Sequence, residues 1–393
     1  MKRTGDTGGY MAPKKILHVI RPAEGGMKDH LVTLSGGLRE KGYQVEVACP
    51  PNSVLASEIE KLGLAVRPIN LVGPLSPGND WVCLNQLQAM MRSGRYDIVH
   101  FHGSKAGLVG RTAAVLARCK KTVQTVHNFV VYEEVPAARK ILYRSGENLL
   151  SRVTSKIITV SEALKEDLVK HYKIKPEKIK VIYNGIEPPG PESFDKTGCR
   201  ARFGIQPGTV VIGTIARMAP QKGLNYLIEA VPLIEAALMQ SEEPVDISFI
   251  IAGDGPLRPG LEELAGKLGV TDKVLFPGFI DNIWETLSCF DIFVTPSIAE
   301  GLSITTIQAM AAGLPVAASR AGGLPEVVKE GVTGFLVRPR GSVELAQAVV
   351  RLVTDRETRQ QFGSNGRSFA VERFSNIQMI NETAGIYEQI LGL

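Results

Sequence analysis

The chain has 393 residues, of which 44% are hydrophobic and 22% charged, and its formal net charge at pH 7 is +5. The length predicts two or three domains, and the composition is that of a soluble globular protein, which excludes a disordered chain or a collagen-like fibre. The uncharged stretch 301–319 contains Gln308, Gly313 and Pro315, so we expect no membrane-spanning helix.

Charge is divided unevenly along the chain. Residues 1–185 carry a net charge of +12 and all six histidines, whereas residues 186–393 carry −7. This asymmetry indicates two domains with different partners, and a basic domain can meet nucleic acid, an anionic membrane surface or a phosphorylated acceptor. No recognition-helix, zinc-finger or aromatic RNA-binding pattern is present, so we expect no nucleic-acid partner.

The cysteines and the first residues bear on the cellular compartment. The five cysteines, at positions 49, 83, 119, 199 and 289, are far apart and include no CxxC pair. Their odd number predicts a reducing cytoplasm rather than a disulfide framework. Lys2 and Arg3 are followed by glycines instead of an apolar run, so we expect no export signal.

Short apolar runs alternate with helix-length segments in the first half of the chain. We expect strands at 14–20, 44–50, 96–103, 121–128, 156–161 and 178–185, and helices at 28–41, 106–118 and 162–172. Each strand run is apolar on both faces and ends in polar residues or glycine, which is typical of parallel strands covered by helices on both sides.

The second half repeats this plan, with strands expected at 209–217, 246–255, 273–279, 289–297, 314–322 and 334–337, and helices at 224–239, 259–268 and 305–312. Two such series predict an α/β protein with two Rossmann-like domains. A Pro/Gly cluster at 188–191 suits the junction between the two domains.

We assign 1–187 to the first domain, 188–375 to the second, and 376–393 to a C-terminal helix that packs back on the first. Ligands of such sheets bind beyond the carboxyl ends of the strands, so we expect the site in a cleft between the domains.

Two common nucleotide sites are excluded. No GxGxxG follows any expected strand, since GDGP at 253–256 has only the first two glycines. No GxxxxGK[ST] occurs either, which excludes a P-loop ATPase or kinase.

Candidate binding residues stand where the expected strands end. Gly25 and Gly26 follow the first strand and open a helix, where backbone N–H groups can approach an anion or where the chain simply makes a tight turn. Arg217 and Lys222 flank Pro220 after the first strand of the second half. They could clamp a diphosphate, or remain solvated loop charges.

An acid and two histidines extend this set. Glu300 precedes a helix whose first turn holds Ser303, and Gln308 follows eight residues after the acid. Such an acid can bind a sugar hydroxyl while the helix N–H groups bind phosphate, or it can be only a helix-terminus charge. His102 and His127 end the third and fourth strands; they can donate to a sugar or phosphate, or be structural.

The segment 137–156 combines apolar residues such as Ile141, Leu149 and Val153 with the basic residues Arg144 and Arg152. It could press onto anionic headgroups, although a helix packed on the sheet with a solvated basic face is the favoured interpretation.

Nine segments together resemble a family 4 glycosyltransferase of the GT-B class, over nearly the whole chain. They are GGMKDHLVTLSGGL (25–38), HFHGSKAGLVGRTAA (100–114), TVHNF (125–129), TVSEALKEDL (159–168), VIYNGI (181–186), IARMAPQKGLNYLIEA (215–230), IIAGDGP (250–256), FPGF (276–279) and PS…EGLS…AMAAGLPV…GGLPEVV (296–328).

The resemblance implies transfer of a sugar from a nucleotide-sugar to an acceptor, with retention of the anomeric configuration. It implies catalytic roles for Arg217 and Lys222 on the diphosphate, Glu300 on a donor-sugar hydroxyl and His127 at the transferred sugar. Phe279 and Ile280 would lie near the base. The remaining positions implied in substrate binding are Gly25, Gly26, His102, Gly253, Leu302, Ser303, Ile304 and Gln308.

One position departs from the family pattern. The family commonly has a second Glu, eight residues after the first, that accepts bonds from both ribose hydroxyls; here it is Gln308. Its amide oxygen can accept, but no charge assists the contact, so we expect ribose binding weaker by about 1 kcal/mol. No Asp-x-Asp motif occurs, so we expect no catalytic metal and no cofactor besides the nucleotide-sugar co-substrate.

The HGSKAG stretch and the basic first half resemble bacterial enzymes that build envelope polysaccharide on lipid-linked intermediates. This implies a UDP- or GDP-sugar donor, a saccharide or lipid-linked acceptor, and a cytoplasmic protein in peripheral contact with the inner face of the membrane. Two alternatives stay open. One is a nucleotide-sugar 2-epimerase of the same fold, and the other is a nucleotide-sugar-binding protein with weakened catalysis, of which Gln308 would be the sign.

Overall fold

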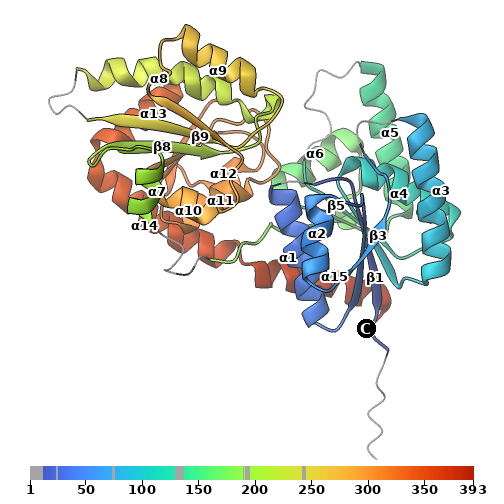
Figure 1. Cartoon of the computed structure of the whole chain (residues 1–393). Coiled ribbons are helices and arrows are strands. Elements are labelled where there is room, and N and C mark those ends of the chain that lie inside the picture. Colours follow the sequence, from blue (N-terminus) through green and yellow to red (C-terminus); the bar gives the residue numbers. More distant parts are fainter. Residues whose placement is uncertain are drawn as a thin grey trace, which may run out of the picture. The chain divides into compact units, whose positions relative to one another are not determined.

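A computed structural model describes residues 12–23, 25–72, 76–128, 137–188, 190, 195–240 and 245–393. The N-terminal segment considered for an export signal lies outside these residues, as do Pro189 and Pro191 of the expected junction. Within the described residues, the chain forms one parallel sheet of seven strands and another of six (Figure 1). The α/β class expected from the alternating runs is therefore confirmed.

The first sheet has the strand order β3-β2-β1-β4-β5-β6-β7. Its strands are β1 (Lys15–Ile20), β2 (Gln44–Cys49), β3 (Ala65–Pro68), β4 (Ile98–His102), β5 (Thr122–Val126), β6 (Lys156–Thr159) and β7 (Ile179–Val181). The helices of this part are α1 (Gly26–Glu40), α2 (Val54–Lys61), α3 (Pro77–Gly94), α4 (Ser104–Leu116), α5 (Ala137–Val153) and α6 (Glu162–Tyr172), with a 3₁₀ turn at Pro176–Lys178.

The buried side chains of these strands point alternately to the two faces of the sheet. Leu17, Val19 and Phe101 pack with buried residues of α3 and α4, and Figure 1 shows α1 and α2 on the other side of the strands. That other face carries His18, which is in register with His100 across β1 and β4. Both faces are buried, which is why the strand sequences are apolar almost throughout.

The second sheet has the order β10-β9-β8-β11-β12-β13. Its strands are β8 (Val210–Ile215), β9 (Ile247–Ala252), β10 (Val274–Gly278), β11 (Ile292–Thr295), β12 (Val316–Ser319) and β13 (Gly334–Val337). Its helices are α7 (Lys196–Arg202), α8 (Leu224–Leu238), α9 (Arg258–Lys267), α10 (Ile283–Ser288), α11 (Ile304–Ala311), α12 (Leu324–Val327), α13 (Ser342–Thr354) and α14 (Arg356–Arg373), with a 3₁₀ turn at Pro220–Lys222.

In this sheet the order reverses beside the first strand of the series, since β8 pairs with β9 on one side and with β11 on the other. The loops after β8, β9, β10 and β11 therefore gather at one edge. Most of the residues proposed from the sequence stand in these loops.

One strand was not predicted. β3 is short and largely exposed, and it pairs with β2 at the edge of the first sheet. Its sequence, AVRP, lacks the continuous apolar run by which the other strands were found, because an edge strand needs burial on fewer sides.

The chain divides into two compact units. The first contains the residues up to Thr125, Leu149–Ile157 and Thr383–Leu393; the second contains Val126–Asn148 and Ile158–Glu382. The division therefore crosses the first sheet within β6, whereas the boundary assigned from the sequence follows β7. Within the first unit, Tyr387 of the C-terminal helix α15 (Asn376–Leu391) is fully buried, with its hydroxyl 2.5 Å from His100 Nδ1.

The cysteine count argues against a disulfide framework, but one pair is bonded. Cys199 on α7 and Cys289 after α10 are bonded, although 90 residues separate them. Sequence spacing gave no sign of this pairing because the fold alone brings α7 against the segment that leads into β11. Cys49, Cys83 and Cys119 are free thiols. Among the described residues, no helix has both the length and the apolar character needed to cross a membrane.

Candidate active site

Two cationic residues follow β8, as the sequence predicted. Arg217 is exposed, and among the described residues its side chain has no hydrogen-bond or ion-pair partner. Lys222 ends the 3₁₀ turn at Pro220–Lys222 and is partly exposed. An unpaired guanidinium and an ammonium on one strand-end loop are suited to an anionic ligand.

Lys222 and Glu300 form the central contact of the site. The Lys222 Nζ lies 2.5 Å from Glu300 Oε2, and the Glu300 side chain is only 7% exposed. Ser297 Oγ also donates to Glu300 Oε2, at 3.3 Å. The sequence predicts a role for the acid and for the lysine separately but gives none for Ser297, whose only signal is its place in the PS…EGLS segment.

Backbone contacts hold the two loops of this pair together. The Gln221 carbonyl oxygen accepts hydrogen bonds from the N–H groups of Ile298 and Ala299, at 2.9 and 3.3 Å. Gly223 has a positive φ of 60°, and a Cβ atom at this position would collide with the Pro296 carbonyl oxygen. A glycine is therefore required for the loop after β8 to approach the loop after β11 this closely.

The N-terminus of α11 lies directly after this loop. Ser303 is its N-cap, and the Ser303 Oγ accepts from Thr306 N at 3.3 Å. Leu302, Ser303 and Ile304 are buried. Because the first N–H groups of a helix lack intrahelical acceptors, this helix start can bind a phosphate oxygen.

Gln308, the departure from the family pattern, lies one turn further along α11. Its side chain is 8% exposed, and its Oε1 has no hydrogen-bond partner among the described residues. A buried amide oxygen without a donor costs free energy. This oxygen is therefore suited to accept a hydrogen bond from a hydroxyl group of a bound molecule.

Two further loops belong to the same edge of the second sheet. Gly253 follows β9 with φ 121°, and a Cβ atom there would collide with the carbonyl oxygen of Ala216, next to Arg217. After β10, the Phe279 side chain is 69% exposed and Ile280 is partly exposed. An exposed aromatic ring beside a tight glycine loop can stack on a planar ligand group.

His127 lies in the same compact unit as these loops. It is buried, and a Cβ atom on Gly301 would collide with its carbonyl oxygen. The glycine after Glu300 thus allows the backbone of His127 to lie directly against the acidic loop. The structure brings His127, Glu300, Lys222 and the start of α11 together within the second unit.

Three of the proposed residues lie in the first unit. Gly25 is exposed, has φ 57° and caps α1, which begins at Gly26, and a Cβ atom on Gly25 would meet nothing within 4 Å. His102 is fully buried, and its Nε2 lies 2.9 Å from His18 Nδ1. The contacts of Gly25, Gly26 and His102 with substrate stay predictions.

A histidine cluster in this unit has the spacing of a metal site. His18, His100 and His102 each offer a nitrogen, and these nitrogens lie within 4.8 Å of one another. They are engaged otherwise: His100 bonds Tyr387 Oη and Thr125 Oγ1, and His18 bonds His102. Burial, together with the charge of His30, lowers the pKa of His18 to about 3. The cluster is thus a hydrogen-bonded network in the core of the first sheet, in which His18 is held neutral.

Family profiles of glycosyltransferases match both halves of the chain. The profile of the family described as "Glycosyltransferase Family 4" matches residues 24–188, and that of "Glycosyl transferases group 1" matches residues 195–369. An uncharacterized glycosyltransferase of Methanocaldococcus jannaschii is 30% identical over 93% of this chain and 94% of its own length.

Two further relatives are informative. The Escherichia coli UDP-Gal:alpha-D-GlcNAc-diphosphoundecaprenol alpha-1,3-galactosyltransferase is 27% identical, over 95% of this chain and 96% of its own length. Anabaena HepE, solved in complex with UDP and glucose, has 24% identity and a TM-score of 0.81, over 95% of this chain and 98% of that structure. The two sheets and these matches together establish that the chain belongs to glycosyltransferase family 4 and has the GT-B fold.

Proposed function

We propose that this chain is a retaining, hexosyltransferase-type glycosyltransferase that takes its sugar from a nucleotide-sugar. The observation that carries the proposal is the contact of Lys222 Nζ with Glu300 Oε2, directly before the start of α11. It places a cation, a carboxylate and free helix N–H groups within one small region. These are the groups that a sugar diphosphate needs, because it presents anionic phosphate oxygens beside neutral hydroxyls.

Lys222 can contact both parts of such a donor. An ammonium has three donor hydrogens, and Glu300 takes one of them. The others can bind diphosphate oxygens together with Arg217, while the second carboxylate oxygen of Glu300 accepts from a sugar hydroxyl. Gln308 Oε1 would accept from the ribose, and Phe279 would lie against the base.

Catalysis follows from where charge develops. When the bond between the anomeric carbon and the phosphate oxygen breaks, negative charge grows on the diphosphate, and fixed cations and N–H groups stabilise it. The acceptor oxygen then bonds to the same face of the anomeric carbon, and its proton passes to the departing phosphate. This route needs no second carboxylate, unlike glycoside hydrolysis, and His127 would lie beside the transferred sugar.

We assign no metal or other cofactor to this reaction, since Arg217 and Lys222 supply positive charge and the sequence has no Asp-x-Asp motif. Turnover is therefore expected to survive a chelator. A loss of turnover with EDTA that Mg²⁺ or Mn²⁺ restores would contradict this.

For the donor, UDP-sugars are favoured over GDP-sugars by HepE, which was solved with UDP and glucose. For the acceptor, a lipid-linked saccharide is supported by the Escherichia coli relative, whose name gives a diphosphoundecaprenol acceptor. The proposed setting is bacterial envelope polysaccharide synthesis, on the cytoplasmic face of the membrane.

The test is a thermal-shift screen against UDP, GDP, ADP and CMP, followed by product analysis with the matching nucleotide-sugars. A ligand that binds the folded state raises the melting temperature by mass action, and we expect the largest shift with UDP. We then expect release of UDP to depend on an added acceptor. Acceptor-independent formation of an epimerised sugar would indicate the epimerase instead, and donor binding without transfer or hydrolysis would indicate a binding protein.

A further inference from the structure

A pocket lies at the opposite edge of the six-stranded sheet from the candidate active site. Its volume is about 530 Å³. It is lined where strands begin: Val210 is the first residue of β8, Asp291 directly precedes β11, and Pro315 directly precedes β12. Arg217 follows the other end of β8, a strand of six residues that spans roughly 20 Å at about 3.3 Å per residue. The pocket is therefore separate from the site of sugar transfer.

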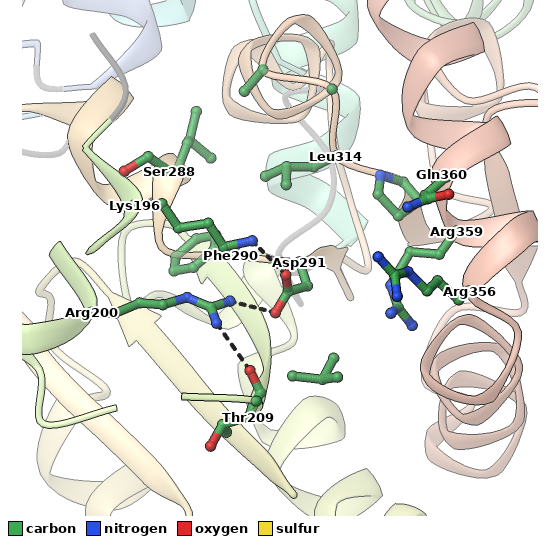
Figure 2. A pocket seen from close by; sticks show the side chains of 16 residues that line it. Lys196, Arg200, Thr209, Ser288, Phe290, Asp291, Leu314, Arg356, Arg359 and Gln360 are labelled. Carbon is green, nitrogen blue, oxygen red and sulfur yellow. Dashed lines mark hydrogen bonds and ion pairs between the residues drawn. The ribbon is translucent and has the colours of Figure 1, made fainter. Parts of the chain in front are cut away.

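Positive charge is in excess around this pocket. Four cationic residues line it, Lys196 and Arg200 from α7 and Arg356 and Arg359 from α14, whereas Asp291 is the one acid among the described residues of its lining (Figure 2). Like charges around a common cavity repel each other unless an anion lies between them.

Asp291 compensates the cations of α7. Its Oδ1 lies 2.7 Å from Lys196 Nζ, and its Oδ2 lies 2.5 Å from Arg200 Nη2 and accepts from Val211 N at 2.8 Å. Burial would raise the pKa of Asp291, but these hydrogen bonds and the two positive charges leave it below its ordinary value. Both carboxylate oxygens are thus already occupied.

The arginines of α14 have no such partner. Arg359 donates through Nη1 to the carbonyl oxygens of Leu352 and Val353, at 2.7 and 2.8 Å. Among the described residues, its other guanidinium nitrogens and the whole side chain of Arg356 have no acceptor. Figure 2 shows both side chains reaching from α14 toward Asp291. Burial lowers the pKa of Arg359 below its ordinary value; the charge of Asp291 raises it, that of Arg356 lowers it, and that of Asp355 raises it, and the net shift is downward.

The rest of the lining is partly apolar. Leu287, Phe290 and Leu314 contribute to the walls, and a volume of this size is within the range of small-molecule sites, roughly 300–1,000 Å³. Inorganic phosphate alone would leave most of it empty. A ligand that fits both features carries a phosphate for the arginines and a compact organic part for the apolar walls.

We propose that this pocket binds a small phosphate ester of the size of a pentose phosphate, with its phosphate held between Arg356 and Arg359. Two guanidinium groups from successive turns of one helix can each give paired N–H donors to phosphate oxygens. The ligand lies roughly a strand length from the diphosphate site, so it is distinct from the donor.

The experiment is a calorimetric titration of the full chain with ribose 5-phosphate, in the presence of saturating UDP, with ribose as the uncharged control. We expect ribose 5-phosphate to bind and ribose not to bind. If ribose 5-phosphate does not bind, or if UDP displaces it, the proposal fails. Should UDP itself not bind, the proposed donor is wrong, and the titration without UDP still tests this pocket through the variants below.

Two charge-reversing substitutions on α14 provide a test variant and a matched control for this pocket. Arg356→Glu and Arg367→Glu alter the net charge equally, and both residues are exposed, but only Arg356 lines the pocket. We expect Arg356→Glu to weaken ribose 5-phosphate binding at least about tenfold, and Arg367→Glu by less than about twofold. Equal effects of the two would overturn the proposal. The UDP-induced rise in melting temperature should be the same in both variants, which confirms that each is folded.

Discussion

Lys222 and Glu300 form the ion pair on which the proposed chemistry depends. Because a fixed cation stabilises the leaving diphosphate mainly in the transition state, Lys222→Ala is expected to lower kcat about a hundredfold or more, with a smaller change in KM. Lys222→Arg should restore part of the loss. The measurement is UDP release from the donor at saturating acceptor.

Arg217→Ala tests the same role with less risk of disturbing the fold. Arg217 is exposed, and its side chain has no hydrogen-bond or ion-pair partner among the described residues. Lys267→Ala is the control, because Lys267 forms an exposed ion pair with Glu263 away from the site. Near-normal turnover in both Lys222→Ala and Arg217→Ala would contradict a cationic grip on the diphosphate.

A substitution at Gln308 is expected to strengthen donor binding, whereas the substitutions of Lys222 and Arg217 are expected to lower activity. The buried Oε1 of Gln308, which has no partner among the described residues, is expected to accept a hydrogen bond from a ribose hydroxyl. Because the amide is uncharged, this hydrogen bond is weaker than one to a carboxylate. Gln308→Glu should therefore tighten UDP binding by about 1 kcal/mol, roughly fivefold in Kd, as measured by calorimetry. Gln308→Ala, which removes the acceptor, should weaken binding. A Glu variant that binds UDP no more tightly than the parent chain would refute this role.

At the scale of elements, the Cys199–Cys289 bond fastens α7 to the segment that leads into β11. It closes a loop of about 90 residues, and a cross-link of this span restricts the unfolded chain. Cys199→Ser is expected to lower the free energy of unfolding by about 2–4 kcal/mol under non-reducing conditions. Urea denaturation with and without dithiothreitol measures this.

Cys119→Ser is the control for that prediction, since Cys119 is a free thiol. It should unfold at the same urea concentration as the parent chain. If Cys199→Ser also matches the parent without reductant, the bond contributes nothing to stability. The test also bears on the proposed cytoplasmic setting, because disulfides are uncommon there.

At the scale of the whole molecule, the surface charge of the basic part determines which partners it can attract. On α5, Leu150 and Ser151 are buried, whereas Ile141, Leu149 and Val153 are at least half exposed, beside the exposed Arg152. The helix thus packs through one side, as the favoured interpretation expected, and has apolar residues on its outer side. We propose that this outer side contacts an anionic membrane.

Flotation with vesicles that contain anionic lipid tests this contact. We expect the chain to float with the vesicles at low salt and to be released at high salt, because screening weakens the attraction of the basic residues. Leu149→Glu should abolish flotation, and Val343→Glu, an equal change at an exposed valine on α13, should not. Salt-independent flotation, or none, would count against the proposal.

The two sheets and most of the candidate residues could be predicted from the sequence, because buried parallel strands and strand-end glycines leave local signals. Gly253 and the Arg217–Lys222 loop stand where the alternation of strands and helices placed them. The edge strand β3 left no such signal, since its short, exposed sequence resembles a loop.

The contacts between distant groups become visible once the chain is folded. The contacts of Lys222 with Glu300, of Cys199 with Cys289 and of His18 with His102 join residues 78 to 90 positions apart. Nothing in the local sequence encodes such pairs, because they follow from the strand order and from how closely the helices pack. The same packing gathers the cations of α7 and α14 around one pocket, although each is unremarkable in its own segment.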